Sequence, residues 1–370
     1  MASNSVSSFL SSVLQKLNLK MSDNGKDDAP PCKKLKIETE KKIGTHGGNF
    51  HCDEALACFL LKRLPEYKNA EIIRTRDPKL LDACDIVVDV GGDYDPEKNR
   101  FDHHQRTFKE NFNSLDSNKK WVTKLSSAGL VYFHFGRQII SDILCKPKED
   151  PITELIYDKV YENFVEEIDA VDNGINPTDE TPRYRQTTGL SSRVGGLNPA
   201  WNEKQDDRDK CFEKAVALTG LEFMDRVNHY KNSWLPARDV VLTAVNNRHK
   251  IDESGEIMCF ENGGAPWKDH LFSIEEELNI DPLIKYVLFA DLSGQWRIQC
   301  VPLRLGTFDN RLTLPEEWLG LRGEELSEKT SIPGCVFVHA NGFIGGANSY
   351  EGVLEMARKS LQLHKQKTIS

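Results

Sequence analysis

The sequence predicts an α/β protein with a parallel sheet in its N-terminal domain and a second, smaller α/β domain after it. The chain has 370 residues, more than one domain usually holds. A hydrophobic fraction of 39% is enough to build cores, and strand-like runs alternate with helical patterns. Strands separated by helices pair in parallel through right-handed crossovers. The composition excludes a wholly disordered chain, and no apolar run reaches the ~18 residues of a membrane span, so we expect no membrane partner.

Residues 1–42 are predicted to be a disordered targeting leader. The first 44 residues carry a net charge of +3, whereas the rest of the chain carries −12. Residues 1–20 contain six Ser and no acidic residue, and their apolar side chains have helical spacing. This pattern is typical of a mitochondrial transit peptide, although such peptides usually carry Arg and this one has none. The basic cluster at 30–37 (PPCKKLKI) is typical of a nuclear import signal. We therefore predict a mitochondrial (matrix) and nuclear protein. The alternatives are that residues 1–20 are only a flexible terminus and that 30–37 is only a solvated linker.

The first domain is predicted to span residues 43–190. Its clearest strand is the buried run IVVDV at 86–90, which is followed by two glycines. Pro78 is placed early in a short helix, and Asp150–Pro151 is a plausible N-cap and first residue of a long one. The predicted strands are 42–45, 70–76 and 86–90, and the predicted helices are 53–64, 78–83, 126–143 and 152–171.

The rest of the chain changes in composition after Gly174. Residues 191–235 are predicted to be a connecting region of loops and one helix, 208–234. Residues 236–370 are predicted to form the second domain. Its predicted strands are 240–245, 286–291, 296–302 and 334–338, and its last helix is 352–363.

Four short segments concentrate His and Asp at the ends of predicted elements. They are His46–Glu54 (HGGNFHCDE), Asp89 at the end of a buried strand, Asp102-His103-His104, and Asp169–Gly174 (DAVDNG). Each segment alone has an ordinary interpretation as a buried histidine, a turn or surface acids. Together they predict a metal centre, because imidazole and carboxylate are metal ligands and sheet ends bind ligands. The mixture favours Mn²⁺, with Mg²⁺ possible, and the spacing suits two ions that a strand-end carboxylate bridges.

These motifs resemble the DHH phosphoesterase superfamily, which includes RecJ-type exonucleases, oligoribonucleases and manganese pyrophosphatases. The matching order is His-x₄-His-x-Asp, a strand-end Asp, Asp-His-His and a later Asp-Asn-Gly. Longer stretches resemble the Myg-type exonuclease family, found in nucleus and mitochondria: IGTHGGNFHCDEALA, DIVVDVGG, FDHHQR, KLSSAGL, YENFVEEIDAVDNGI and GFIGGANSYEGVL. The resemblance extends from Ile43 to Leu363. It implies a DHH-like catalytic domain and a substrate-binding domain across a cleft.

The resemblance also implies ligand sets. One ion would be bound by His46, His51 and Asp89, and the other by Asp53, Asp89, His103 and Asp172, with Asp89 bridging the two. The catalytic residues would be Asp89, His104 facing the scissile phosphate, and Asp102 orienting a neighbouring imidazole. Superfamily members commonly have Asp where this chain has His51, a departure that lowers the negative charge of the site. Asp169 is the alternative to Asp172, which better resembles the family's Asp-Thr-Gly turn.

The predicted substrate-binding residues lie in a glycine-rich segment of the second domain. It reads HANGFIGG, follows the predicted strand 334–338 and precedes a helix. Its backbone N–H groups are expected to bind a phosphate or a 3′ end through His339, Gly342, Gly345 and Gly346. A structural turn is the alternative. Other candidate contacts are Arg183, Arg185, Trp296 and Arg297, although core or surface roles are favoured for these four. The polar segment 191–202 (SSRVGGLNPAWN) is distinctive, but its pattern indicates no role beyond shaping the cleft.

The resemblance and the motifs together predict a hydrolase: a metal-dependent phosphodiesterase that acts as a 3′–5′ exonuclease on RNA. It would release nucleoside monophosphates from a single-stranded 3′ end during organellar and nuclear RNA processing. Two alternatives stay open. One is a small-molecule phosphohydrolase for pyrophosphate, a dinucleotide or a bisphosphate nucleotide. The other is an RNA-binding regulator that has lost catalysis, with His51 as the altered ligand. The net charge of −9 argues for local contacts and metal ions over a broad basic surface.

Overall fold

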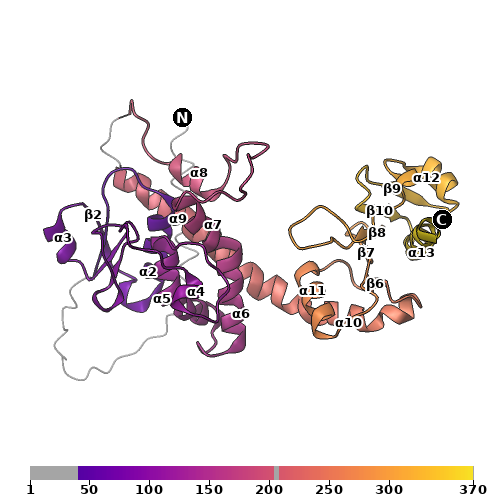
Figure 1. Ribbon diagram of the computed structural model, residues 1–370, viewed down its shortest axis with the longest axis horizontal. Helices are drawn as coiled ribbons and strands as arrows, with labels where there is room; N and C mark the ends of the chain where they lie inside the picture. The colour runs from indigo at the N-terminus through magenta and orange to yellow at the C-terminus, as the bar shows by residue number, and fades with distance from the viewer. Residues whose placement is uncertain (1–40, 204–207, 370) are drawn as a thin grey trace, which may run out of the picture. The chain divides into compact units, whose positions relative to one another are not determined.

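The structure is a computed structural model that describes residues 41–203 and 208–369 (Figure 1). Residues 1–40 of the predicted targeting leader lie outside the described residues, whereas its last two residues are described and Lys42 begins the first strand. The mixed α/β class is confirmed, because the described chain contains two five-stranded sheets, each with parallel strands and packed helices. No helix among the described residues combines the length and the apolar character needed to cross a membrane.

The first sheet has the strand order β2-β1-β3-β5-β4. Its strands are β1 (Lys42–Thr45), β2 (Glu71–Arg74), β3 (Ile86–Val88), β4 (Tyr94–Asp95) and β5 (Arg100–Phe101). The predicted parallel sheet is confirmed for β2, β1, β3 and β5, and only β4 pairs antiparallel, with β5. Ile43 of β1 faces Ile72 of β2 and Ile86 of β3, so β1 and β3 end at the same edge of the sheet.

Helices cover both faces of this sheet. The elements are α2 (Cys52–Arg63), η1 (Pro65–Tyr67), α3 (Pro78–Asp82), η2 (Pro96–Lys98), α4 (Phe112–Leu115), α5 (Ser127–Leu144), α6 (Pro151–Val160), the π-helical η3 (Tyr161–Val165) and α7 (Glu166–Asp172). Ile86 and Val88 belong to the large core that includes α2 and α5, whereas Val87 packs with Leu81 and Cys84 on the other side. Because β3 is buried on both faces, its sequence is continuously apolar.

A helical run joins the two sheets along the chain. After α8 (Leu190–Gly195) come α9 (Arg208–His229), the π-helical η5 (Tyr230–Trp234) and α10 (Leu235–Ile251). The helix α9 packs closely on α2, since a Cβ atom added at Gly220 would lie 2.1 Å from the ring of Phe59. The predicted strand at 240–245 is wrong, because these residues lie within α10. Its buried residues Ala237, Val241, Ala244 and Val245 have helical spacing, and this pattern overrides the strand preference of valine.

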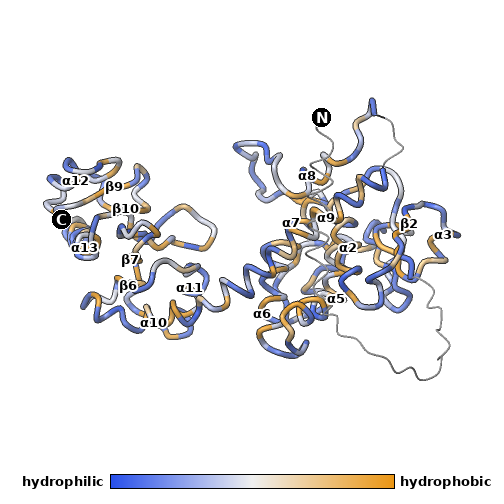
Figure 2. The backbone as a smooth tube through the Cα atoms, turned by 180° about the vertical axis from the view of Figure 1, so that it is seen from behind, coloured by the Kyte–Doolittle hydropathy of each residue, from blue (hydrophilic) through white to orange (hydrophobic). Residues whose placement is uncertain are grey.

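The second sheet has the order β6-β7-β8-β10-β9 and is antiparallel except for the pair β6–β7. Its elements are β6 (Ile257–Phe260), α11 (Lys268–Glu277), β7 (Tyr286–Ala290), β8 (Trp296–Cys300), η6 (Glu316–Trp318), α12 (Gly323–Thr330), β9 (Cys335–Val338), β10 (Ile344–Ala347) and α13 (Tyr350–Ile369). Ile257 and Met258 join different cores, so both faces of β6 are buried. Figure 2 shows that hydrophobic residues are also concentrated in the neighbouring strand β7 and, near the first sheet, in α2.

The glycine-rich segment is not the continuous loop that the sequence predicts. His339 is exposed and Gly342 is at a tight turn with φ 66°, but Gly345 and Gly346 lie within β10. This strand is paired on both sides, with β8 and with β9, so its backbone N–H groups lie in sheet ladders. A Cβ atom at Gly346 would lie 2.9 Å from the carbonyl oxygen of Trp296. Close packing of strands therefore explains these glycines. Substrate binding by this segment stays a prediction, as do the domain boundaries.

Candidate metal centre

Asp89 lies at the centre of the site, immediately after strand β3. Its φ of 60° is in the left-handed region, which costs a non-glycine residue roughly 1 kcal/mol or more. The residue is 4% exposed, and Ser127 Oγ donates a hydrogen bond to its Oδ1 at 3.1 Å. Ordinary strand geometry would alternate side chains between the two faces of the sheet. The strained turn instead holds the Asp89 carboxylate at the sheet edge.

The first group of candidate ligands surrounds His46, which follows strand β1. His46 Nε2 lies 3.0 Å from Glu54 Oε1 and 3.3 Å from Asp89 Oδ2. Its Nδ1–H donates to the Gly47 carbonyl oxygen at 3.2 Å, so Nε2 is the ring nitrogen that faces the two carboxylates. The ligand atoms of His46, His51, Glu54 and Asp89 all lie within 4.8 Å of one another. Burial lowers the pKa of His46, but hydrogen bonds to Asp89 and Glu54 outweigh it and raise that pKa to about 10. The group thus attracts positive charge, whether a proton or a cation.

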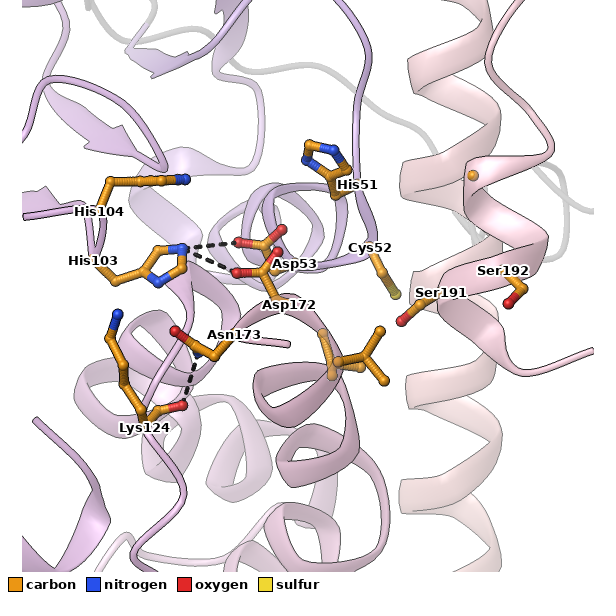
Figure 3. Close-up of a pocket in the computed structure, with 13 residues that line it drawn as sticks. His51, Cys52, Asp53, His103, His104, Lys124, Asp172, Asn173, Ser191 and Ser192 are labelled. Carbon is orange, nitrogen blue, oxygen red and sulfur yellow. Dashed lines mark hydrogen bonds and ion pairs between the residues drawn. The ribbon is translucent and has the colours of Figure 1, made fainter. Parts of the chain in front are cut away.

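The second group is built around His103, which Figure 3 shows beside Asp53 and Asp172. His103 Nε2 lies 3.1 Å from Asp172 Oδ2, 3.3 Å from Asp89 Oδ1 and 4.0 Å from Asp53 Oδ2. Asp53 and Asp172 also form a possible ligand set with His51, again within 4.8 Å. The two oxygens of Asp89 therefore face different histidines: Oδ2 faces His46 and Oδ1 faces His103.

Several polar atoms of this second group lie at ion-pair distance from one another but make no hydrogen bond to a described residue. Asp53 is fully buried, and neither of its carboxylate oxygens accepts a hydrogen bond from any residue that the structure describes. Both ring nitrogens of His103 are likewise buried without a hydrogen bond to a described residue. Burial and the nearby charges of Asp89 and Asp172 raise the pKa of Asp53 well above its usual value. Buried carboxylates are normally paired or bind metals, so a divalent cation fits these residues.

Asp102 and His104 form a pair at the mouth of the site. Asp102 Oδ1 lies 2.7 Å from His104 Nδ1, and Asp102 Oδ2 accepts the backbone N–H of Gly92 at 2.6 Å. The hydrogen bond to Asp102 raises the pKa of His104. The His104 side chain is 63% exposed, unlike that of His103. Of the two neighbouring imidazoles, Asp102 therefore orients His104 and leaves its Nε2 facing outward.

Asp169 and Asp172 have different surroundings, although both are in α7. Asp169 Oδ1 accepts hydrogen bonds from Ser126 N (2.9 Å), Ser126 Oγ (2.7 Å) and Gly129 N (3.1 Å), and Tyr161 OH donates to Oδ2 at 3.0 Å. Asp169 is fully buried. It satisfies donors around the start of α5, whereas the Asp172 carboxylate faces His103. The geometry favours Asp172 over Asp169 as a ligand.

Sequence reasoning missed Glu54. This residue is fully buried, and its carboxylate accepts the backbone N–H of His51 at 2.8 Å and 3.0 Å while also facing His46. Glu54 is the third residue of α2, and His51 is the N-cap. A Glu at this position of a helix is the signature of a capping box, so the signal was present in the sequence. Glu54 brings a carboxylate to the first group that the predicted set did not contain.

Two adjoining cavities open onto these groups. The larger has a volume of about 580 Å³ and is lined by His51, Asp53, His103, Asp172 and, from α8, Ser191 among others. The smaller, about 460 Å³, is lined by His46, Asp89, Asp102 and the exposed Arg76 among others. His51 and His104 line both. The structure thus brings all eight predicted N-terminal site residues together. His339, Gly342, Gly345 and Gly346 are described only within the second sheet and its turn.

Comparison with known proteins gives one consistent family. Residues 42–361 match the family model MYG1_exonuc, described as an uncharacterised protein family (UPF0160). The chain is 54% identical to the MYG1 exonuclease of Mus musculus over 340 residues, which is 91% of this chain and 90% of that protein. It is 53% identical to the MYG1 exonuclease of Homo sapiens over 340 residues (91% and 90%) and 52% identical to the MYG1 protein of Dictyostelium discoideum over 323 residues (86% and 96%). No solved structure matches.

Proposed function

Because this chain belongs to the MYG1 exonuclease family, we propose that it is a metal-dependent exonuclease that degrades single-stranded RNA from the 3′ end. The observation that carries the metal dependence is the buried Asp53 carboxylate, which has no donor among the described residues and lies beside Asp172 and His103. The four carboxylates of the two groups would repel the phosphate of a nucleic acid, so a nuclease needs a cation at such a place.

Two divalent cations, which we propose to be Mn²⁺, fit the two groups. His46, His51, Glu54 and Asp89 would hold one, and Asp53, Asp89, His103 and Asp172 the other. Asp89 is suited to bridge them, since its two oxygens face opposite histidines. When bound, such ions supply an activated water at neutral pH and neutralise charge on the phosphate. The strained backbone of Asp89 and the hydrogen bond from Ser127 hold the shared carboxylate in place.

His104 is suited to transfer a proton to the leaving oxygen of the phosphodiester. Its Nδ1–H is bonded to Asp102, which fixes the ring and stabilises the imidazolium form. Its outward Nε2 belongs to a side chain that lines both cavities. Asp102 is itself held by the Gly92 backbone N–H, so His104 has a fixed orientation beside the candidate metal groups.

The proposal is tested with purified full-length protein and RNA labelled at the 5′ end. A ladder that shortens with time in Mn²⁺, with release of nucleoside monophosphates, is the expected result, and EDTA should stop it. DNA of the same sequence measures the preference for RNA. Turnover of pyrophosphate or a dinucleotide without degradation of RNA would instead indicate a small-molecule phosphohydrolase. Binding of RNA without turnover would indicate a regulator that has lost catalysis.

A pair of variants tests the site. Asp89→Asn should lower kcat/KM by more than about 100-fold, because it removes the shared ligand. Asp85→Asn is the matched control, since Asp85 lies just before the same strand and pairs with Lys41 at 2.7 Å, away from the two groups. It should retain activity within about twofold. Equal activity of the two variants would refute the role of Asp89.

We also propose that the protein acts in mitochondria and the nucleus. The support is the sequence of the leader, with its transit-like residues 1–20 and its basic cluster at 30–37. Imaging a full-length fusion beside one that starts at Met21 tests this. Identical distributions would contradict a transit peptide.

A further inference from the structure

The helix α8 forms one wall of the larger cavity. Ser191, Ser192 and Gly195 line that cavity together with His51 and Asp172 (Figure 3). These residues belong to the polar segment 191–202, which the roles proposed above leave unused. A segment that lines the cavity beside candidate metal ligands is placed to contact whatever substrate enters it.

The position of this segment is fixed to the His51 loop by Asn198. The Phe50 backbone N–H donates to Asn198 Oδ1 at 2.9 Å, and Asn198 Nδ2 donates to the Phe50 carbonyl oxygen at 2.8 Å. Phe50 is fully buried, so its backbone groups need these partners. Because Phe50 precedes His51, the two hydrogen bonds tie the segment after α8 to a candidate ligand.

The chain on each side of α8 presents an exposed aromatic side chain. Trp201 is 92% exposed and Tyr184 is 72% exposed. The chain's five other tryptophans are buried or half-buried. Trp201 is three residues beyond Asn198, so its Cα lies within about 11 Å of that anchor even in a fully extended chain. Both rings are therefore accessible to a ligand, on the two segments that flank the cavity wall formed by α8.

Two arginines accompany Tyr184 on the segment that precedes α8. Arg183 and Arg185 flank Tyr184, are exposed, and have no ion-pair partner among the described residues. Arg193 of α8, in contrast, is paired with Glu222 at 2.7 Å. The two arginines therefore place two positive charges next to an exposed aromatic ring. Aromatic rings that stack on bases and arginines that contact phosphates are the combination that binds single strands.

We propose that residues 183–202 bind the single strand upstream of its 3′ end, with Trp201 and Tyr184 stacking on bases and Arg183 and Arg185 contacting phosphates. This inference rests on the proposed exonuclease function and names its substrate class more narrowly. The substrate is a strand of several nucleotides, and not a dinucleotide or pyrophosphate. Such small substrates would occupy the cavity without reaching these side chains.

The first test compares substrates of two lengths. The ratio of kcat/KM for a ten-nucleotide RNA to that for a dinucleotide with the same 3′ residue should be well above one for the wild-type protein. Trp201→Ala should lower this ratio about tenfold, mainly through KM, because it removes one stacked base. Trp201→Phe should restore most of it. Phe308→Ala is the control, because Phe308 is also fully exposed but lies beyond β8 in the second sheet region. It should leave the ratio unchanged.

The second test measures stacking directly. With Asp89→Asn protein, so that the strand stays intact, a ten-nucleotide RNA should shield the exposed tryptophan from acrylamide quenching, and Trp201→Phe should abolish the change. An unchanged length ratio in Trp201→Ala, or a Trp201 that RNA does not shield, would refute the proposed RNA binding by residues 183–202. If RNA is degraded but the Trp201 variants behave as wild type, this binding proposal fails and the exonuclease proposal stands. If RNA shields Trp201 but is never degraded, the exonuclease proposal fails and the binding proposal stands.

Discussion

Replacing Asp53 by Asn should have opposite effects on stability with and without metal. Without metal, Asp53 is a fully buried carboxyl group with no hydrogen-bond donor among the described residues and with other carboxylates beside it. The amide of Asn has nearly the same shape and no charge. We therefore expect Asp53→Asn to stabilise the metal-free protein and to weaken the stabilisation that Mn²⁺ gives.

The size of the first effect follows from the spacing of the ligand atoms. Ligand atoms of Asp53 and Asp172 lie within 4.8 Å, and two unit charges at that distance repel by about 3.5 kcal/mol at an effective dielectric constant of 20. Asp53 can relieve part of this by taking up a proton, so the gain in the variant should be about 1–3 kcal/mol. Mn²⁺ at 100 times its Kd would stabilise the wild-type protein by about 2.7 kcal/mol, and only by about 0.4 kcal/mol if the variant binds 100-fold more weakly.

Asp169→Asn is a matched control, because Asp169 is also a fully buried aspartate near the site. It accepts four hydrogen bonds, from Ser126, Gly129 and Tyr161, where Asp53 accepts none from described residues. Its amide variant should not stabilise the metal-free protein as Asp53→Asn does, because the Asn nitrogen replaces one of the oxygens that accept these hydrogen bonds. The stabilisation by Mn²⁺ should be nearly unchanged, because Asp169 does not face the candidate ligands.

Thermal melts at pH 8 of EDTA-treated protein, with and without added Mn²⁺, measure both effects. This pH is above the value of about 7 to which burial raises the pKa of Asp169. In EDTA the Asp53→Asn protein is expected to melt above both wild type and Asp169→Asn. An Asp53→Asn protein that melts below wild type in EDTA would refute the argument that repulsion between neighbouring carboxylates destabilises the metal-free protein. An equal Mn²⁺ response in Asp53→Asn and wild type would refute its role as a ligand.

Two further predictions concern residues outside the ligand groups. Hydrogen bonds from Arg137 and Lys119 lower the pKa of Glu154 from 4.5 to about 2, so Glu154→Gln should be less stable than wild type near pH 7, and the difference should fade as the pH drops from about 4.5 towards 2. Urea midpoints measured against pH check this, and a difference that does not vary with pH would contradict it. Asn198→Ala leaves the buried backbone N–H and C=O of Phe50 without partners, so it should cost roughly 2–4 kcal/mol and raise KM for RNA. Asn198→Asp keeps only the acceptor, so its stability and its KM should lie between those of wild type and Asn198→Ala. A KM equal to wild type in both variants would show that this contact does not position the segment.

The sequence predicted the first sheet well because its elements carry local signals. The apolar run of β3, the early proline of α3 and the Asp150–Pro151 start of α6 are all found where the pattern placed them. The error at 240–245 arose because adjacent valines favour a strand, whereas the packing of α10 decides the outcome. The strand β10 was missed for a related reason. Its glycines have poor strand propensity, and only the close neighbours on both sides explain them.

The four segments that hold the candidate ligands were predictable because each lies at a recognisable element end, and the resemblance to a known family supplied the ligand sets. The resemblance also favoured Asp172 over Asp169, but helical spacing alone does not separate them, since residues three apart on a helix lie near one face. The donors that surround Asp169 come from α5 and η3, which are distant in the sequence. Sequence spacing carries no information on such donors.

Glu54 changes what the departure at His51 implies. A histidine where the DHH phosphoesterases that the sequence resembles commonly have aspartate removes one negative charge from the first group, which suggests weaker metal binding. The structure places the Glu54 carboxylate 3.0 Å from His46 Nε2, in the same group as His51 and Asp89. The group therefore keeps two carboxylates beside its two imidazoles. The start of α2 further favours negative charge at Asp53 and Glu54, because the helix dipole is positive there. The substitution thus leaves a binding site for a divalent cation, and loss of catalysis does not follow from His51 alone.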